Sequence, residues 1–174
     1  YPLRNLSTWK IGGPAEMVYW PETTEALIAC WHYARTENIP VRIIGLGSNI
    51  LCPDEGLPGL TVVTTRLTKI FWEGRKVVVG AGYSLGRLAL EAGQKGLSGL
   101  EFARGIPGTV GGAIVMNAGA HGEEIADRLV RVETLDENGQ VRSWERGELQ
   151  FGYRQSSLSQ GYWVLQAELE LVPG

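Results

Sequence analysis

Residues 105–122 read GIPGTVGGAIVMNAGAHG, and the organisation of the chain follows from what must lie against them. Six of these eighteen residues are glycine, yet aliphatic residues stand among them, so the stretch is neither a flexible linker nor an ordinary strand. Glycine lets a backbone approach another group closely and adopt positive φ. We predict that the main chain here lies flat against a planar ligand, at Gly105, Gly108, Gly111 and Gly112. A crowded crossing of two backbones in the core is the alternative.

A second glycine segment, GLGSN at Gly45–Asn49, directly follows a predicted buried strand. Such a turn points several backbone N–H groups at one place, and Ser48 and Asn49 add a hydroxyl and an amide, which suits a phosphate. Ile50 replaces the third glycine of a dinucleotide fingerprint, and the lysine of a P-loop is missing. A tight turn without a ligand is the alternative. Together, the two glycine segments fit one large ligand with a diphosphate and a flat ring, and FAD meets that description.

A third segment, FGYRQS at residues 151–156, follows a polar turn. Arg154, next to Tyr153, can present a planar fork to a carboxylate, which a lysine could not match. The alternative is a surface arginine on a loop.

Hydrophobic periodicity predicts an α+β chain with two units, residues 1–67 and 68–174. In the first unit, strands are expected at 16–20, 41–44 and 60–64, with a turn at Gly56–Gly59 and a helix at 23–38. In the second, hairpins are expected at 69–79 and 129–144, a helix at 84–95, and a half-buried antiparallel strand at 163–171. On that last strand, Glu168 and Glu170 are interpreted as solvent-facing residues.

Composition excludes several classes of protein. With 44% hydrophobic and 20% charged residues and a net charge of −3, the chain is typical of a globular protein and has no basic excess for nucleic acid. No apolar stretch approaches the roughly 20 residues that span a bilayer. Cys30 and Cys52 lie in no cysteine or histidine cluster, so we expect two reduced thiols and no metal site.

Four strings, in order, resemble the UDP-N-acetylenolpyruvoylglucosamine reductases: LSTWKIGGPAE, GLGSNIL, GLSGLEFARGIPGTVGGAIVMNAGAHGEEI and FGYRQS. The resemblance covers nearly the whole chain and implies the two-subdomain FAD-binding fold of the vanillyl-alcohol-oxidase/PCMH type. It implies that the diphosphate lies in residues 1–67 and the isoalloxazine in residues 68–174. The cofactor-binding residues are then Gly45, Leu46, Gly47, Ser48, Asn49, Ile50, Gly105, Ile106, Pro107, Gly108, Thr109, Gly111 and Gly112.

The resemblance also implies an activity. In this family, NADPH reduces the flavin, which in turn reduces UDP-N-acetylglucosamine enolpyruvate to UDP-N-acetylmuramate, in cytoplasmic peptidoglycan precursor synthesis for cell wall biogenesis, cell shape and cell division. The family's catalytic arginine matches Arg154, which would hold the substrate carboxylate and stabilise the developing enolate. Tyr153 and Asn117 are expected to contact the substrate. The oligomeric state stays open.

The chain departs from the family at its end. Family members continue into a third, substrate-closing domain that carries a proton-donating serine and a glutamate, whereas this sequence stops at Gly174. We expect an N-terminal portion of a full reductase. It begins with Tyr1 rather than Met, so an earlier leader is left open. The alternatives are a complete, stand-alone FAD-binding module, or a sugar or alcohol oxidase of the same fold with flavin linked to His32 or His121.

Overall fold

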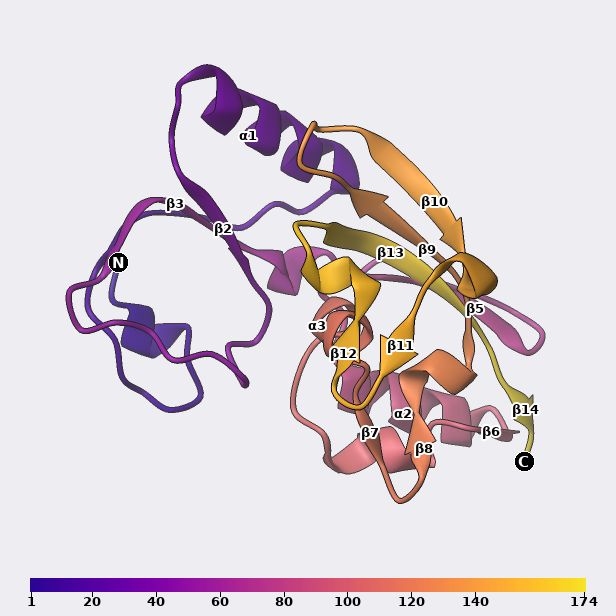
Figure 1. Cartoon of the computed structure of the whole chain (residues 1–174). Helices are drawn as coiled ribbons and strands as arrows, with labels where there is room; N and C mark the ends of the chain where they lie inside the picture. The colour runs from indigo at the N-terminus through magenta and orange to yellow at the C-terminus, as the bar shows by residue number, and fades with distance from the viewer.

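The computed structural model describes all residues, 1–174, and contains two sheets of different type (Figure 1). The first is parallel, with α1 (Thr24–Thr36) beside it and the strand order β1 (Ala15–Tyr19), β3 (Leu57–Val63), β2 (Val41–Ile44). The second is antiparallel, in the order β10 (Val141–Glu145), β9 (Leu129–Leu135), β13 (Trp163–Glu170), β5 (Lys76–Gly80), β4 (Ile70–Glu73). The α+β class is therefore confirmed.

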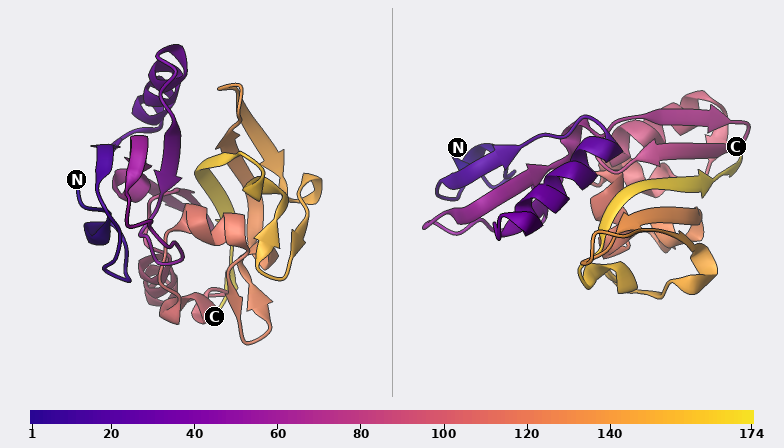
Figure 2. Two further views of the ribbon diagram at one scale, coloured as in Figure 1. Left: turned by 60° about the vertical axis from the view of Figure 1, so that its left-hand side comes forward. Right: turned by 90° about the horizontal axis from the view of Figure 1, so that it is seen from above.

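The second half of the chain also contains two α-helices and three two-stranded sheets. The helices are α2 (Leu85–Gln94) and α3 (Val110–Met116). The pairs are β6 (Leu97–Ser98) with β14 (Val172–Pro173), β7 (Gly119–Ala120) with β8 (Glu123–Glu124), and β11 (Phe151–Gly152) with β12 (Gln155–Ser156). Figure 2 shows α3 between the two sheets.

The two expected long helices form where their capping residues predict. Thr23 caps α1 by accepting a hydrogen bond from the Ala26 N–H (3.0 Å), and Ser84 caps α2 by accepting from the Arg87 N–H (3.3 Å). Beyond the C-terminal ends, Asn38 and Gly96 have φ of 54° and 71°. This left-handed conformation stops each helix.

The expected turn at Gly56–Gly59 is wrong, because β3 already begins at Leu57. Ala15 pairs with Leu57 and Met17 pairs with Leu60, so β3 carries one extra residue there. This bulge accommodates Pro58, which has no N–H to donate, and Gly59, whose φ is +76°. Glycine clustering indicated a turn, whereas the strand absorbs both residues in an irregular pairing.

The helix α3 was not expected within the glycine-rich stretch. Thr109 caps it by accepting from the Gly112 N–H (3.2 Å). Gly111 lies in its first turn, and a Cβ there would come within 2.9 Å of the Ala81 Cβ. At this residue the alternative of two closely crossing backbones is correct, since the missing side chain lets α3 pack on the end of β5.

The larger of the hydrophobic clusters, with 23 buried residues, lies in the second half of the chain, and a second cluster of 8 joins the two halves. It contains Leu27 and Trp31 of α1 and Val62 of β3, but also Leu135 of β9 and Leu165 of β13. Residues 1–67 therefore bury their helix partly against side chains from the antiparallel sheet. The division at residue 67 separates the two sheets in sequence, and as a division into folding units it stays a prediction.

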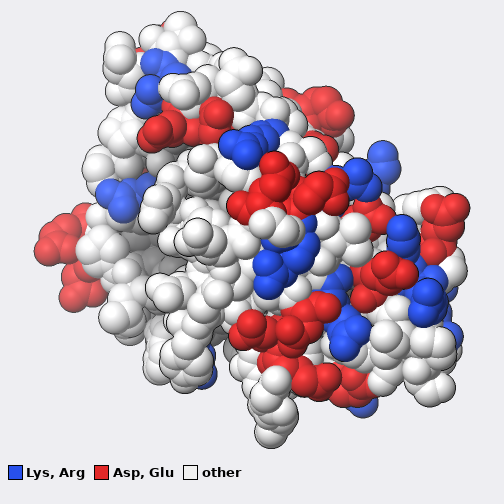
Figure 3. Space-filling view, turned by 45° about the vertical axis from the view of Figure 1, so that its right-hand side comes forward, with Lys and Arg blue, Asp and Glu red and all other residues white.

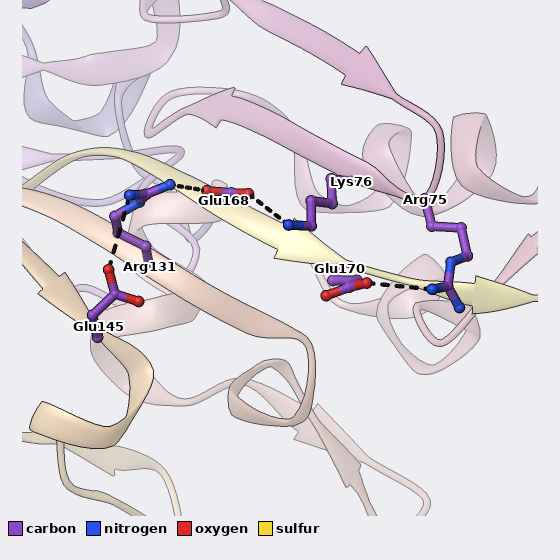
Figure 4. A network of polar contacts seen from close by, with 6 residues as sticks. All are labelled: Arg75, Lys76, Arg131, Glu145, Glu168 and Glu170. Atoms are coloured by element: carbon purple, nitrogen blue, oxygen red, sulfur yellow. Dashed lines mark hydrogen bonds and ion pairs between the residues drawn. The ribbon is translucent and has the colours of Figure 1, made fainter.

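Ion pairs link neighbouring strands of the antiparallel sheet (Figure 4), and Figure 3 shows acidic and basic side chains intermixed over one side of the molecule. Glu168 pairs with Arg131 on one neighbouring strand and with Lys76 on the other (3.8 Å), and its side chain is only 12% exposed. Glu170 pairs with Arg75 at 3.5 Å and is 42% exposed. The interpretation of Glu168 as simply solvent-facing is therefore wrong, because long side chains from both adjacent strands cover it.

We expect this difference to appear in stability. Glu168→Gln should lower the free energy of unfolding by about 1–2 kcal/mol, because two cations lose a partner in a largely covered position. The matched Glu170→Gln change should cost less than about 0.5 kcal/mol. Urea unfolding measures the free energy of unfolding of both variants. The difference between their losses of stability should become smaller at high salt, because salt screens the charges. Equal costs would contradict a special role for Glu168.

Other features of the structure bear on the excluded classes. None of the helices has the length and apolar character of a membrane-spanning segment, and no group of three His, Cys, Asp or Glu side chains is placed to hold a metal ion. Cys30 and Cys52 are free thiols, and burial raises the pKa of each.

Candidate functional site

A cavity of about 610 Å³ lies where the two glycine segments meet. Its lining comes from the end of β2 and the loop after it, from the segment before α3 and α3 itself, from the start of β13, and from the β11–β12 turn. From the predicted set it includes Gly45, Leu46, Gly47, Ser48, Asn49, Ile50, Ile106, Pro107, Gly108, Thr109, Gly111, Gly112 and Arg154. Residues some sixty positions apart in sequence thus face one space.

Direct contacts hold the two glycine segments together. The Ser48 hydroxyl donates a hydrogen bond to the Pro107 carbonyl (3.1 Å). A Cβ on Gly45 would come within 2.6 Å of Thr109 Oγ1. The two segments therefore form one wall of the cavity rather than two separate loops.

The loop of residues 45–49 is shaped by the N-terminal segment of the chain. Gly47 has a φ of +68°, and a Cβ there would lie 1.8 Å from the Leu6 carbonyl oxygen. The Thr8 N–H donates to the Gly47 carbonyl (3.0 Å). Glycine is thus required at residue 47 by the neighbouring backbone, and this packing fixes the direction of the loop.

Backbone N–H groups along this loop have no acceptor within the chain. From Leu46 to Ile50, none of the five N–H groups donates a hydrogen bond to protein, nor do those of Gly108 and Thr109 on the facing segment. Unsatisfied N–H groups are costly unless a ligand or water accepts from them. Clustered at one wall, they suit the oxygens of an anionic group.

Gly112 is the glycine that opens the cavity from α3. It is exposed, and a Cβ there would have only Thr109 Oγ1 nearby, at 3.4 Å. In contrast, the buried Gly111 faces Ala81. Of these two neighbours, Gly112 is therefore the one whose missing side chain leaves room for a ligand.

Arg154 supplies the only charged side chain in the lining. It lies in the two-residue turn between β11 and β12, with a φ of 52°, a left-handed conformation that costs a non-glycine residue about 1 kcal/mol. Its Nε donates to the Tyr153 hydroxyl (3.0 Å), and this bond raises the pKa of the guanidinium. The cavity therefore carries a permanent positive charge at its edge and no carboxylate.

Three predicted site residues lie outside the cavity lining. Gly105 is exposed, with nothing within 4 Å of an added Cβ. Tyr153 is 84% exposed and reaches the site only through Arg154. Asn117 is 2% exposed, and both ends of its amide bond to backbone, at Gly152 and Ala126. The expected substrate contact by Asn117 is therefore corrected to a buried structural contact.

Some lining residues were missed by the sequence analysis. They include Tyr162, Trp163 and Val164 at the start of β13, Ala81 after β5, and Val115, Met116 and Ala118 in and after α3. Trp163 was interpreted only as part of the apolar face of a strand. No local signal marks such residues, because the packing of β13 beside α3 brings them to the site.

Neither histidine lines the cavity. His32 packs against the β9–β10 turn, where a Cβ on Gly139 would lie 2.5 Å from its ring, and His121 is exposed between β7 and β8. The structure therefore provides no support for an oxidase with flavin linked to either residue.

Comparison with known proteins places this geometry in a family. The model of a family described as FAD binding domain matches residues 15–144. The chain belongs to this FAD-binding family. FAD is accordingly its cofactor, and the expected FAD-binding fold is confirmed.

Individual members are similar over nearly the whole chain. A UDP-N-acetylenolpyruvoylglucosamine reductase of Synechococcus sp. strain JA-3-3Ab is 47% identical over 99% of this chain and 56% of its own length. One of Moorella thermoacetica is 45% identical over 99% of this chain and 57% of its own. The crystal structure of the reductase from Thermus caldophilus has a TM-score of 0.85 at 39% identity, covering 99% of this chain and 61% of that one. The chain thus spans somewhat over half the length of these relatives.

The residues of the cavity fit the cofactor of the family. FAD has a diphosphate, which unpaired N–H groups can bind, and a flat ring system, which needs an apolar space free of side chains. Residues 46–50 have the unpaired N–H groups that a diphosphate requires. Gly112 and the surrounding aliphatic residues leave the apolar space that a flat ring requires.

Proposed function

We propose that this chain is the FAD-binding portion of a cytoplasmic, NADPH-dependent UDP-N-acetylenolpyruvoylglucosamine reductase, which forms UDP-N-acetylmuramate for peptidoglycan. The observation that carries the proposal is the position of Arg154. The FGYRQS hairpin brings this one positive charge to the edge of a cavity lined by both glycine segments. A reductase acting on an enolpyruvyl group needs such a charge to hold the carboxylate beside the flavin.

Different residues of the chain bind the cofactor and the substrate. The N–H groups of residues 46–50 hold the diphosphate of FAD, and the first turn of α3 receives its ring. FAD, when bound, supplies the chemistry that accepts hydride from NADPH and donates it to the substrate. Arg154 binds and orients the substrate carboxylate, and its positive charge stabilises negative charge that develops there during reduction.

The proposal is tested with purified full-length protein loaded with FAD. We expect NADPH oxidation that depends on UDP-N-acetylglucosamine enolpyruvate, together with a product heavier than the substrate by two hydrogens in mass spectrometry. The same sugar nucleotide without the enolpyruvyl group is the control and should support no oxidation. A visible absorption spectrum of the 174-residue chain with added FAD tests cofactor binding separately.

The outcomes separate the proposal from its alternative. A bound flavin spectrum together with substrate-dependent oxidation supports the reductase. A bound flavin spectrum without any substrate-dependent oxidation by the full-length protein would leave a flavin-binding protein without reductase activity and overturn the reductase assignment.

A further inference from the structure

Arg154 is exposed to solvent, and little on its own turn holds it in place. It forms no salt bridge, and its side chain bonds only to Tyr153, which is itself 84% exposed. Arg154 itself has a left-handed backbone conformation, which is energetically unfavourable for a residue other than glycine. Something outside the turn must therefore keep the guanidinium at the cavity.

The strand before the turn is tied to the C-terminal end of α3. The Asn117 Nδ2 group donates to the Gly152 carbonyl (2.9 Å), and its Oδ1 accepts from the Ala126 N–H (3.3 Å). Asn117 is 2% exposed, so its amide would be costly to leave unpaired.

The strand after the turn is tied to the same helix end. The Ser156 hydroxyl donates to the Val115 carbonyl (2.6 Å) and accepts from the Leu158 N–H (3.3 Å). Carbonyls in the last turn of a helix have no partner within the helix, and Ser156 supplies one. Figure 1 shows β12 next to α3, with β11 on the far side of β12.

The short helix α3 therefore contacts both the cavity and the hairpin that carries Arg154. Its first turn, with Thr109 and Gly112, lines the cavity, and its last turn holds both strands of the hairpin that carries Arg154. Since α3 has only seven residues, the two ends lie about 10 Å apart, at 1.5 Å per residue. The helix fixes the distance between the ligand space and the guanidinium.

We propose that Asn117 and Ser156 are positioning residues that act through Arg154, a role that rests on the proposed reductase function. They hold the hairpin so that the guanidinium stays in line with the substrate carboxylate, and they touch neither substrate nor FAD. Displacement of a binding group by about 1 Å costs up to roughly 100-fold in rate, so loss of either bond should be measurable.

Asn117→Asp isolates the bond to the hairpin. Asn117 has a φ of 47°, which aspartate tolerates, and the aspartate can still accept from the Ala126 N–H. As a carboxylate it cannot donate to the Gly152 carbonyl, and because burial favours the protonated acid, which could donate, the variant is compared at neutral and alkaline pH. The helix end is thus preserved while the link to the hairpin is broken. Ser156→Ala removes the second link independently.

The expected results are measured on full-length protein loaded with FAD. Asn117→Asp should lower the rate of substrate reduction by roughly 10- to 100-fold and leave flavin reduction by NADPH and FAD affinity unchanged. In an Arg154→Ala background, Asn117→Asp should have no further effect on substrate reduction, because the residue acts through the arginine. Amides of residues 152–156 should exchange hydrogen faster, whereas those of α3 should not.

A matched control separates positioning from stability. Thr23→Ala removes the hydrogen bond that the Thr23 hydroxyl accepts from the Ala26 N–H (3.0 Å) at the start of α1, and neither residue lines the cavity. It should destabilise the protein without changing either half-reaction. Equal slowing of both half-reactions by Asn117→Asp, or a further loss in the Arg154→Ala background, would overturn the inference.

Failure of the proposed function is distinguishable from failure of this inference. If the wild-type protein does not reduce the sugar nucleotide, the reductase assignment fails. Hydrogen exchange then tests by itself whether the bond from Asn117 to Gly152 holds the hairpin. Unchanged exchange at residues 152–156 in Asn117→Asp would then show that the bond does not hold the hairpin.

Discussion

Gly112→Leu is expected to raise the Kd for FAD by roughly 10- to 100-fold while leaving the ligand-free chain at least as stable as wild type. The leucine side chain would project from α3 into the cavity, where nothing but Thr109 lies within 4 Å of the Cβ. Crowding of a ligand space typically costs about 1–3 kcal/mol, which corresponds to that loss of affinity. Leucine is also a better helix former than glycine, by roughly 0.5–1 kcal/mol.

Fluorescence titration with FAD and urea unfolding without FAD measure the two effects. Gly93→Leu is the matched control, because Gly93 is an exposed glycine of α2 with nothing within 4 Å of an added Cβ and lies outside the lining. It should give a similar gain in stability and no change in affinity. Gly111→Leu should instead destabilise the chain without FAD, since its Cβ meets Ala81. If Gly112→Leu bound FAD as tightly as wild type, the ring would not lie against α3.

Arg154→Gly is expected to slow reduction of the enolpyruvyl substrate by roughly 100- to 1,000-fold, the usual cost of removing a group that stabilises developing negative charge. Reduction of the flavin by NADPH should be unchanged, because the carboxylate is absent from that half-reaction. The fold should not suffer: glycine relieves the left-handed strain at a φ of 52°, so the free energy of unfolding should stay the same or rise by up to about 1 kcal/mol.

Stopped-flow absorbance resolves the two half-reactions on the full-length protein. Arg154→Lys keeps the charge but loses the planar fork, and we expect it to recover only part of the lost rate. Tyr153→Phe is a further control, since it removes only the hydrogen bond to Arg154 Nε and should have a smaller effect. Equal slowing of both half-reactions by Arg154→Gly would remove the arginine from this role.

Elements with a strong local signal were predictable from the sequence. The helices α1 and α2 have capping residues and regular apolar spacing, and the strand β13 alternates between buried and partly buried residues over its second half. The region around Pro58 and the short helix α3 could not be predicted in the same way. In both places glycine or proline weakens the local preference, and contacts with distant strands decide the conformation.

The sequence also predicts some residues of the candidate site and not others. Both glycine segments and Arg154 were visible because few residue types suit anion binding and close approach of a backbone, and these residues do line the cavity. The different reasons for Gly111 and Gly112 were not visible, because two adjacent glycines look alike until the direction of each missing Cβ is known. The sequence likewise predicts a ligand contact at Asn117, whereas its buried amide bonds backbone on both sides.

The sequence by itself determined the α+β class, most helices and strands, and the three segments that carry the chemistry, since each depends on interactions between residues close together along the chain. Only the tertiary structure decided that residues 46–50, Gly112 and Arg154 face one cavity, and that the last turn of α3 holds the arginine hairpin. The reason is physical: these relations depend on hydrogen bonds and packing between segments up to about a hundred residues apart, and no local preference encodes such a distance.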